Sequence, residues 1–347
     1  MPTPIMVGII VSNYGWRSLC TLPLFQSNAL KAQSFNREHV YCLSVVRLIR
    51  GLKVTTLAEN MVGSECLGQW GLSFLLEFSD AKGDERTMVF DTGMHKQALL
   101  YNIKKLKVDL SDVNCVVLSH GHLDHTGATV EVVKAAGGVK VYAHPHTFLS
   151  RFHVDKSGKK RQIGVPRGEQ LSDVEIAGGK VVLSAEPVEV VPGLWTTGQI
   201  ERVTSFERPL PLSEGEKLTI LVDGKTVDDS ILDDQALWMD VEEVGPVVIT
   251  GCAHAGPVNT LLHVQKIGGF KRLHGLLGGT HLVGRSEEYV QQTVKELRRF
   301  GLSLISPCHC TGFKATVRLW QAFPEAFVMN FSGRIIQAGK EPESRVF

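Results

Sequence analysis

Three histidines and an aspartate lie within residues 120–125, directly after a short apolar run. No other stretch of the sequence constrains the fold as strongly. The apolar run spans residues 113–118, and the segment that follows is Ser-His-Gly-His-Leu-Asp-His-Thr-Gly over 119–127. A short apolar run of this kind is typical of a buried strand, so the polar side chains lie in the turn where that strand ends. Imidazole nitrogens beside a carboxylate suit zinc or another borderline divalent ion better than calcium or magnesium.

The spacing of these donors divides them between two ions. His120 and His122 can both turn toward one ion, whereas Asp124 and His125 can reach a second ion beside it. Isolated surface or core histidines are the alternative, and four donors in this pattern make that interpretation the weaker one. We therefore predict a centre with one or two divalent ions, with zinc as the expected metal and manganese or iron as alternatives.

Glycine-bearing turns elsewhere in the chain accompany this motif. They are residues 71–73, 90–93, 196–200, 250–256, 278–282 and 307–312. With 119–127 they resemble the metallo-β-lactamase superfamily, and within it the dihydropteroate-synthase-like branch, which includes an enzyme that joins a dihydropterin to a ribofuranosyl-aminobenzene phosphate. The resemblance implies an α/β fold: an αββα sandwich of two mixed sheets, with helices on the outer faces and metals at one edge.

The hydrophobic pattern after residue 52 fits this architecture, because short β-favouring runs alternate with helical stretches. The clearest helix is expected over 287–300, with Glu287 and Glu288 in its first turn, basic residues near its end and Gly301 to terminate it. The other expected helices are 96–106, 128–136, a segment after Pro257, and 311–323.

Two further histidines are expected to complete the metal centre. His254 and His309 each follow a buried apolar run and lie in turns near glycines. We assign His120, His122 and His254 to one ion, and Asp124, His125 and His309 to the other. His144 and His146 form a rival His-x-His pair, which we disfavour because no carboxylate or third histidine follows closely.

Two residues are expected to support the ligands. Asp91 corresponds, by the resemblance, to an aspartate that orients a ligand histidine, and its alternative is a turn-forming aspartate. Cys252 stands after Thr250-Gly251, where many superfamily members have a bridging aspartate. A thiolate can bind zinc but is no equivalent bridge, so the occupancy of the second ion stays open.

Asp124 and His281 are the candidate catalytic residues. Asp124 either hydrogen-bonds a reacting water or binds metal, and His281 either binds metal or faces the substrate. The weaker candidates for substrate contact are Thr280, Thr311 and Gly312.

A divalent ion with an open position lowers the pKa of bound water to about 7. We therefore expect a metal-dependent hydrolase that uses a metal-bound hydroxide on a small ester, lactone or phosphoester. The resemblance offers one alternative, a transferase that joins a dihydropterin diphosphate to an aminobenzene ribofuranosyl phosphate. A metal-bearing binding protein without activity is the other alternative.

Composition limits the partners. The formal net charge of +1 argues against nucleic acid or an anionic membrane as a partner, and no apolar run approaches the roughly 20 residues that span a bilayer. A small, anionic substrate is expected, and the oligomeric state is not predicted. Seven scattered cysteines in a chain of this length indicate reduced thiols and a cytoplasmic protein.

Two regions differ from the rest of the chain. Residues 1–51 are predicted to be an N-terminal extension: they are poor in acids and carry several basic residues, so organelle targeting is the alternative to an extension packed on the core. Residues 52–347 are predicted to form the metallo-β-lactamase-like domain. Within it, the Lys- and Arg-rich stretch 150–180 is expected to be an exposed basic insertion, either merely solvated or gripping an anionic substrate.

Overall fold

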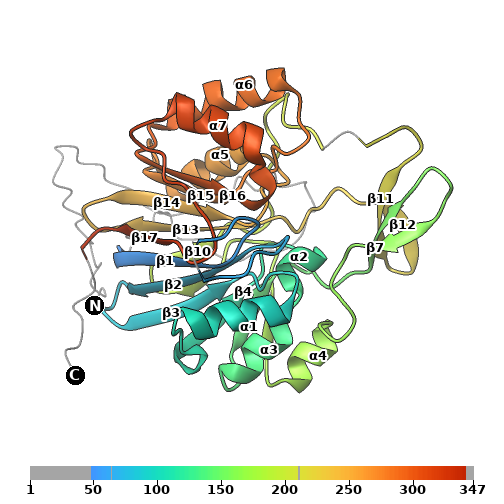
Figure 1. Ribbon diagram of the computed structural model, residues 1–347, viewed down its shortest axis with the longest axis horizontal. Helices are drawn as coiled ribbons and strands as arrows, with labels where there is room; N and C mark the ends of the chain where they lie inside the picture. The colour runs from blue at the N-terminus through green and yellow to red at the C-terminus, as the bar shows by residue number, and fades with distance from the viewer. Residues whose placement is uncertain (1–47, 64, 210–211, 341–347) are drawn as a thin grey trace, which may run out of the picture. The chain divides into compact units, whose positions relative to one another are not determined.

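Two β-sheets lie face to face, and helices cover their outer faces (Figure 1). This computed structural model describes residues 48–63, 65–209 and 212–340. The predicted N-terminal extension falls almost wholly outside these ranges. The αββα sandwich predicted from the sequence is confirmed.

The first sheet has seven strands in the order β17-β1-β2-β3-β4-β5-β8. Its β17, β1, β2 and β3 pair antiparallel, whereas β3, β4, β5 and β8 pair parallel. The strands are β1 (Arg50–Ala58), β2 (Ser73–Ser79), β3 (Glu85–Phe90), β4 (Val113–Val117), β5 (Lys140–Ala143), β8 (Lys180–Leu183) and β17 (Ile335–Ala338).

The second sheet has six strands in the order β16-β15-β14-β13-β10-β9. They are β9 (Glu189–Val191), β10 (Leu194–Thr196), β13 (Ala236–Val241), β14 (Gly245–Thr250), β15 (Gly275–Gly279) and β16 (Leu304–Cys308). β14, β15 and β16 are neighbours and run parallel, so their carboxyl ends open onto the same edge of the sheet.

Helices cover the outer faces of both sheets (Figure 1). Those on the first sheet are α1 (Lys96–Lys105), α3 (Thr129–Ala135) and α4 (Leu171–Ile176), with the single turn α2 (Leu123–Thr126) at one end, and those on the second are α5 (Pro257–Gly268), α6 (Glu287–Leu297) and α7 (Phe313–Ala322). Short 3₁₀ segments span Leu110–Asp112, Arg298–Phe300 and His309–Thr311. In the described ranges, no helix is long and apolar enough to cross a membrane.

Local signals explain where the helices begin and end. The Ser286 hydroxyl accepts a hydrogen bond from the Tyr289 amide and so caps α6. Pro257 occupies the first turn of α5, where a missing amide hydrogen costs nothing. Gly269 and Gly301 follow α5 and the extension of α6 with left-handed φ values of 69° and 73°.

Successive side chains of a strand point to opposite faces, so the apolar side chains form three layers. One lies between the two sheets, and the other two lie between each sheet and its helices. In β2, Phe74 and Leu76 point between the two sheets, whereas Leu75 points toward the helices of the first sheet. In β14, Val247 likewise faces the other sheet, and Val248 faces α5 to α7. Both sheets are thus buried on both faces, which leaves their strand ends as the place where polar groups gather.

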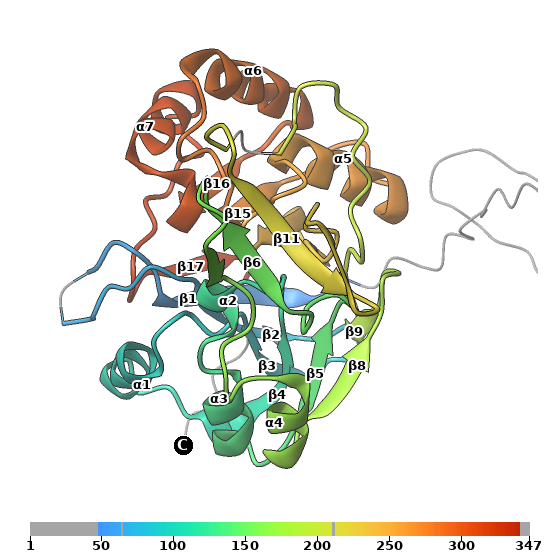
Figure 2. The ribbon, with the colours of Figure 1, turned by 90° about the vertical axis from the view of Figure 1, so that its right-hand side faces the viewer.

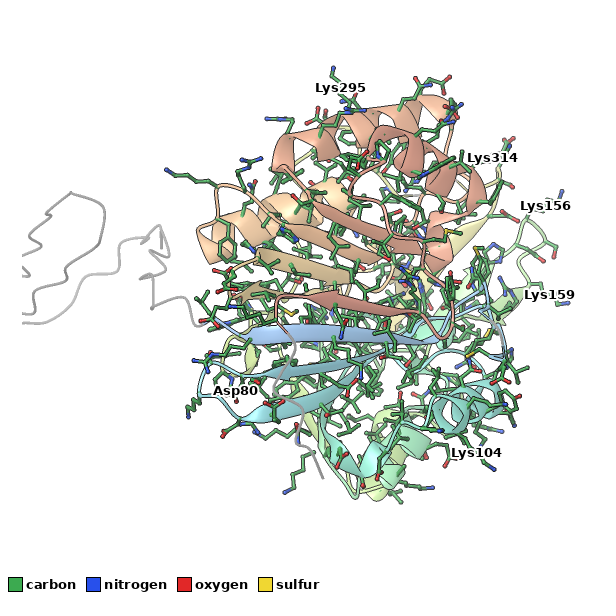
Figure 3. All side chains as sticks on the ribbon, turned by 60° about the vertical axis from the view of Figure 1, so that its left-hand side comes forward. Asp80, Lys104, Lys156, Lys159, Lys295 and Lys314 are labelled. Atoms are coloured by element: carbon green, nitrogen blue, oxygen red, sulfur yellow. The ribbon has the colours of Figure 1, made fainter. Side chains whose placement is uncertain are left out.

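A third, smaller sheet joins the sandwich at the end where α2 lies (Figure 1, Figure 2). Its antiparallel strands are β6 (Arg151–Val154), β7 (Lys160–Gln162), β11 (Lys217–Val222) and β12 (Lys225–Asp228), in the order β12-β11-β6-β7. Lys156 and Lys159 lie at its outer end and point into solvent (Figure 3).

The stretch 150–180 is not exposed throughout, although the sequence predicted an exposed insertion. The side chain of Arg151 is fully buried, and those of Val165, Glu169 and Val174 are buried too. Arg151 is buried because two aspartates from a distant loop pair with its guanidinium. Regular structure also occupies much of the stretch, since β6, β7 and α4 all fall within it.

The layer between the sheets is expected to dominate stability. Phe74→Ala should lower the free energy of unfolding by about 3–5 kcal/mol, because the fully buried ring would leave a cavity between two rigid sheets. Tyr101→Ala, at a 41% exposed position on α1, is the control and should change it by less than about 1 kcal/mol. Urea unfolding followed by circular dichroism measures both, and equal effects would contradict this account of the core.

Candidate metal centre

The ends of β3, β4, β14, β15 and β16 bring the candidate ligands together at one edge of the sandwich. His120 and His122 follow β4, and Asp124 and His125 lie in α2. His254 follows β14, and His309 follows β16. The structure thus places all six predicted metal ligands in two compact groups, the same two that the sequence predicted.

The first group consists of three imidazoles. The Nε2 atom of His120 lies 3.0 Å from Nδ1 of His122 and 3.2 Å from Nε2 of His254. Burial lowers the pKa of His122 to about 3, and it lowers the pKa values of His120 and His254 well below the usual value. These side chains are therefore neutral and carry the free lone pairs that a metal ion requires.

The nitrogen atoms that face one another identify the atom of each ring that an ion would contact. They are Nε2 of His120, Nδ1 of His122 and Nε2 of His254. The group therefore fits a divalent ion with imidazole ligands.

The second group joins a carboxylate to two imidazoles. The Nε2 atoms of His125 and His309 are 3.2 Å apart, and Oδ2 of Asp124 lies 3.4 Å from Nε2 of His309. Burial opposes ionisation of Asp124, yet the imidazoles of His125 and His309 lower its pKa below the usual range. The carboxylate is therefore ionised, which fits a metal ligand better than a general base.

Asp91 orients the second group through a hydrogen bond to His125. Its Oδ2 atom accepts hydrogen bonds from Nδ1 of His125 and from the Ser119 hydroxyl, both at 2.7 Å, and its Oδ1 accepts one from the Ser119 amide. Burial disfavours protonation of His125, but Asp91 and then Asp124 raise its pKa to about 9. The contact fixes Nδ1 as the protonated atom and leaves Nε2 facing the ion position, as the sequence-based role of Asp91 requires.

Gly251 explains why a glycine precedes Cys252. A Cβ atom at this position would lie 2.0 Å from the Ser119 hydroxyl and 2.9 Å from Oδ2 of Asp91. Any larger residue would push the β14 turn away from the Asp91 and Ser119 contact. The glycine of the Thr-Gly pair that the sequence singled out is thus a packing requirement of the centre.

Two residues at the end of β1 also hold the centre, and no local sequence pattern pointed to them. The Asn60 side chain places Oδ1 3.1 Å from Nδ1 of His309 and donates from Nδ2 to the His309 carbonyl. The buried Glu59 carboxylate accepts a hydrogen bond from the His309 amide. Their only sequence signal is a polar pair directly after a β-favouring run.

A pair of buried aspartates ties two ligand turns together, and the sequence did not reveal it either. Oδ2 of Asp233 accepts the Gly121 amide at 2.7 Å, between His120 and His122. Oδ2 of Asp234 accepts the Ala255 amide at 2.8 Å, next to His254. The other oxygen of Asp233 accepts from Arg151 at 2.5 Å, which links the small sheet to the same point.

Cys252 and His281 lie beside the two groups. Sγ of Cys252 is 3.1 Å from Nε2 of His125, so Cys252 lies close enough to be a ligand itself. The His281 ring lies against the His254 ring with centroids 4.1 Å apart. His144 and His146 belong to neither group, nor to any other cluster of metal-binding type in the described part of the chain.

The three weaker candidates for substrate contact do not line the cavity at this site. Thr280 and Thr311 are buried, and their hydroxyls are hydrogen-bonded to each other at 2.9 Å. Gly312 begins α7 with a φ of 74° and packs against Val283. The sequence placed these residues correctly in ligand-bearing turns, but the threonines tie the turns after β15 and β16 together instead of facing outward.

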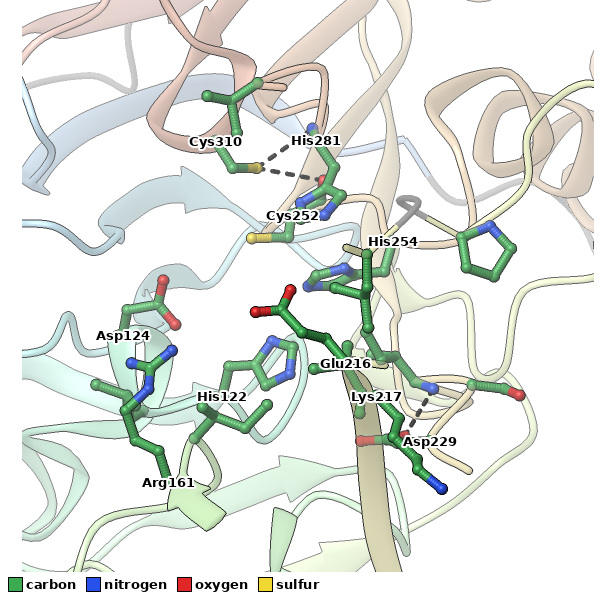
Figure 4. A pocket seen from close by; sticks show the side chains of 18 of the residues that line it. His122, Asp124, Arg161, Glu216, Lys217, Asp229, Cys252, His254, His281 and Cys310 are labelled. Atoms are coloured by element: carbon green, nitrogen blue, oxygen red, sulfur yellow. Dashed lines mark hydrogen bonds between the residues drawn. The ribbon is translucent and has the colours of Figure 1, made fainter. Parts of the chain in front are cut away.

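A cavity of about 730 Å³ opens beside the two groups (Figure 4). Its polar wall includes His122, Asp124, His254, His281 and His309. The small sheet also lines it, with Arg161 from β7 and Lys217 from β11, and the exposed Trp70 is part of the lining as well.

The fold and the site together define an αββα protein whose sandwich edge carries a histidine- and aspartate-rich centre beside a cavity. The family model described as the metallo-beta-lactamase superfamily matches residues 71–309, and the chain belongs to that superfamily.

Two archaeal relatives from Methanocaldococcus jannaschii align over most of the chain. One is named 7,8-dihydropterin-6-methyl-4-(beta-D-ribofuranosyl)-aminobenzene-5'-phosphate synthase; it is 32% identical over 294 residues, which cover 83% of this chain and 97% of the relative. The other is an uncharacterized protein, 30% identical over 285 residues, covering 82% and 99%. A solved structure described as a metal-dependent hydrolase of the beta-lactamase superfamily superposes with a TM-score of 0.67 at 24% identity, covering 83% of this chain and all of that one.

The neutral imidazoles predict how pH acts on the metal-free protein. Below pH 6.5 the unfolded chain protonates its histidines, whereas folded His122 resists protonation until the pH approaches 3. Stability should therefore fall as the pH falls from 6.5 to 5, by about 1.4 kcal/mol per pH unit for each histidine held neutral. Urea midpoints of chelator-treated protein measure this slope.

The matched variants for this prediction are His122→Leu and His153→Gln. His122→Leu should reduce the slope of stability against pH by about 1.4 kcal/mol per pH unit, the contribution of one histidine. His153→Gln, on the small sheet, should leave it unchanged, and a slope that survives equally in both variants would contradict the assignment.

Asn60 should control the affinity of the second group. Asn60→Ala should weaken zinc binding about 10- to 100-fold, because Nδ1 of His309 loses the partner that orients its ring. Competition with a chromophoric chelator measures the affinity. Asn114→Ala, at an exposed position on β4, is the control, and an unchanged affinity in Asn60→Ala would show that Asn60 has no such role.

Proposed function

We propose that this protein is a metal-dependent transferase that joins a dihydropterin-type donor to an aminobenzene ribofuranosyl phosphate. The observation that carries the proposal is the archaeal synthase, which aligns over 97% of its own length and 83% of this chain. The sequence favoured hydrolysis and held transfer as the alternative. Because the archaeal relative is named a synthase, we prefer transfer to hydrolysis.

The cavity supports a substrate larger than a simple ester. A volume of about 730 Å³ falls within the range that holds drug-sized ligands. Trp70 is 51% exposed, and its ring lies 5.3 Å from the His309 ring, so a flat heterocycle could stack on it next to the metal centre.

The cavity carries charges of both signs, and two of its cations are available to an anionic group. Arg161 and Lys217 line it without an ion pair to another described residue, and the carboxylates of Glu216, Asp228 and Asp229 line it too. A phosphate group placed between the small sheet and the histidine groups would meet both cations. We therefore propose a small phosphate-bearing partner, and not nucleic acid or a membrane.

The chain's own residues would hold two zinc ions, His120, His122 and His254 one and Asp124, His125 and His309 the other. When bound, such ions supply positive charge that stabilises a departing phosphate oxygen or lowers the pKa of water. In the transfer, the arylamine nitrogen attacks the pterin methylene carbon, the carbon–oxygen bond breaks and diphosphate leaves with the bonding electrons. The nitrogen then releases its extra proton to solvent. Asp124 is ionised and faces the cavity, and His281 lies beside His254 at the same wall.

Hydrolysis is the second candidate function, and a specific observation favours it. The ionised Asp124 and the neutral imidazoles of His122 and His254 line the cavity, an arrangement that suits the activation of water in metal-dependent hydrolases. The substrate would then be a small ester, lactone or phosphoester.

One experiment separates these functions. The full-length protein, reconstituted with zinc, manganese or iron, is incubated with dihydropterin diphosphate, with the aminobenzene ribofuranosyl phosphate, and with both. Transfer predicts a joined product only when both are present, and release of diphosphate in equal amount. Turnover of phosphodiesters or lactones without an acceptor would establish hydrolysis, and metal binding without any turnover would leave a binding protein.

Asp124→Asn should lower the rate of either reaction at least about 100-fold, because the second group loses its charged member. Asp223→Asn is the matched control, since Asp223 lies in the exposed turn between β11 and β12. Full activity in Asp124→Asn would exclude the proposed role of this carboxylate.

A further inference from the structure

Three further side chains that could bind a metal ion lie next to the two histidine groups, and none of them is a member of either group. Cys252, His281 and Cys310 come from the turns that follow β14, β15 and β16. These three strands are parallel neighbours, so their carboxyl ends deliver the three side chains to one point.

The donor atoms lie close together in a buried setting. One ligand atom from each of the three residues lies within 4.8 Å of the other two. Cys252 and Cys310 are only 3% and 2% exposed. Two thiols and an imidazole at this spacing match the donors of Cys₂His zinc sites.

An independent observation points to a missing partner for His281. Its Nδ1 atom is buried and has no hydrogen-bond partner among the described residues. The site otherwise satisfies its polar atoms: the His281 amide donates to Sγ of Cys310 at 3.3 Å, and Sγ of Cys310 lies 3.5 Å from the Cys252 carbonyl. An amide that donates to a sulfur atom also stabilises the thiolate form that a metal requires.

The position of the cluster relative to the cavity shows what a bound ion could contact. Cys252, His281 and Cys310 all line the cavity, and they lie together at one side of it (Figure 4). Cys252 also lies 3.1 Å from Nε2 of His125, so its sulfur faces both this cluster and the second histidine group. A thiolate in that position would screen two neighbouring cations from each other.

We propose that Cys252, His281 and Cys310 form a third metal position, for zinc or another thiophilic ion, with an open coordination site toward the cavity. Catalytic zinc sites with three protein ligands leave the fourth position to water or substrate in the same way. This site is additional to the two histidine groups, and it does not depend on whether the protein is a transferase or a hydrolase.

Cadmium titration of the metal-free, full-length protein tests the proposal, with thiolate-to-cadmium absorption as the readout. The test variant is Cys310→Ala. The matched control is Cys308→Ala, which removes an equally buried cysteine two residues away, whose side chain packs in the layer between the sheets. Both variants keep the remaining cysteines, so adventitious binding to those thiols is the same in each.

The expected result is that Cys308→Ala binds cadmium like the unmodified protein. Cys310→Ala should bind one ion fewer and lose the thiolate-to-cadmium absorption of this site, because an ion that no longer binds contributes no absorption. Equal stoichiometry and absorption in the two variants would overturn the proposal and leave Cys310 as a packing residue. His122→Ala should lose an ion without losing absorption, which separates this site from the first histidine group.

A second variant covers the case in which Cys310→Ala fails to fold. Cys310→Ser keeps the size of the side chain and its hydrogen bonds, and circular dichroism checks its fold. It should also bind one ion fewer, because a neutral hydroxyl is a poor substitute for a thiolate ligand. Retention of the ion in folded Cys310→Ser would likewise overturn the proposal.

Discussion

The buried carboxylate of Asp91 is the contact on which the metal centre depends. It accepts hydrogen bonds from the Ser119 amide, the Ser119 hydroxyl and Nδ1 of His125, and Ser119 in turn lies 2.9 Å from Nδ1 of His120. One anion thereby orients a histidine from each of the two groups. The arrangement also requires the glycine at 251, because any side chain there would occupy the space of these contacts.

Burial and charge act in opposite directions on neighbouring imidazoles. His122 loses its proton readily because burial dominates, whereas His125 keeps a raised pKa because Asp91 and Asp124 outweigh its burial. A cation at the second group would take the place of the proton on His125, and a cation at the first group would meet imidazoles that are already neutral. Both groups therefore gain from a cation, for different electrostatic reasons.

The small sheet joins the cavity wall to the ligand turns. Arg151 in β6 pairs with Asp233, and Asp233 also accepts the amide of Gly121 between two ligand histidines. A displacement of the small sheet by a bound substrate would thus act on a buried ion pair next to the first group. Buried pairs of this kind tolerate little movement, because separation leaves a charge unpaired in a dry environment.

The sequence by itself indicated the elements and the candidate ligands, and its resemblance to a known superfamily implied the architecture. The 3.6-residue pattern of 287–300, the glycine at 301 and the short apolar runs before each ligand turn are local signals, and the structure has the corresponding elements. Only the tertiary structure decided which polar residues support those ligands. Asn60 and His309 are 249 residues apart, and Gly121 and Asp233 are 112 apart. Such pairings depend on which strand ends become neighbours in the sheets, and no local periodicity records that. For the same reason the sequence predicted an exposed Arg151 and offered Thr280 and Thr311 as weaker candidates for substrate contact, whereas partners from distant turns bury all three side chains.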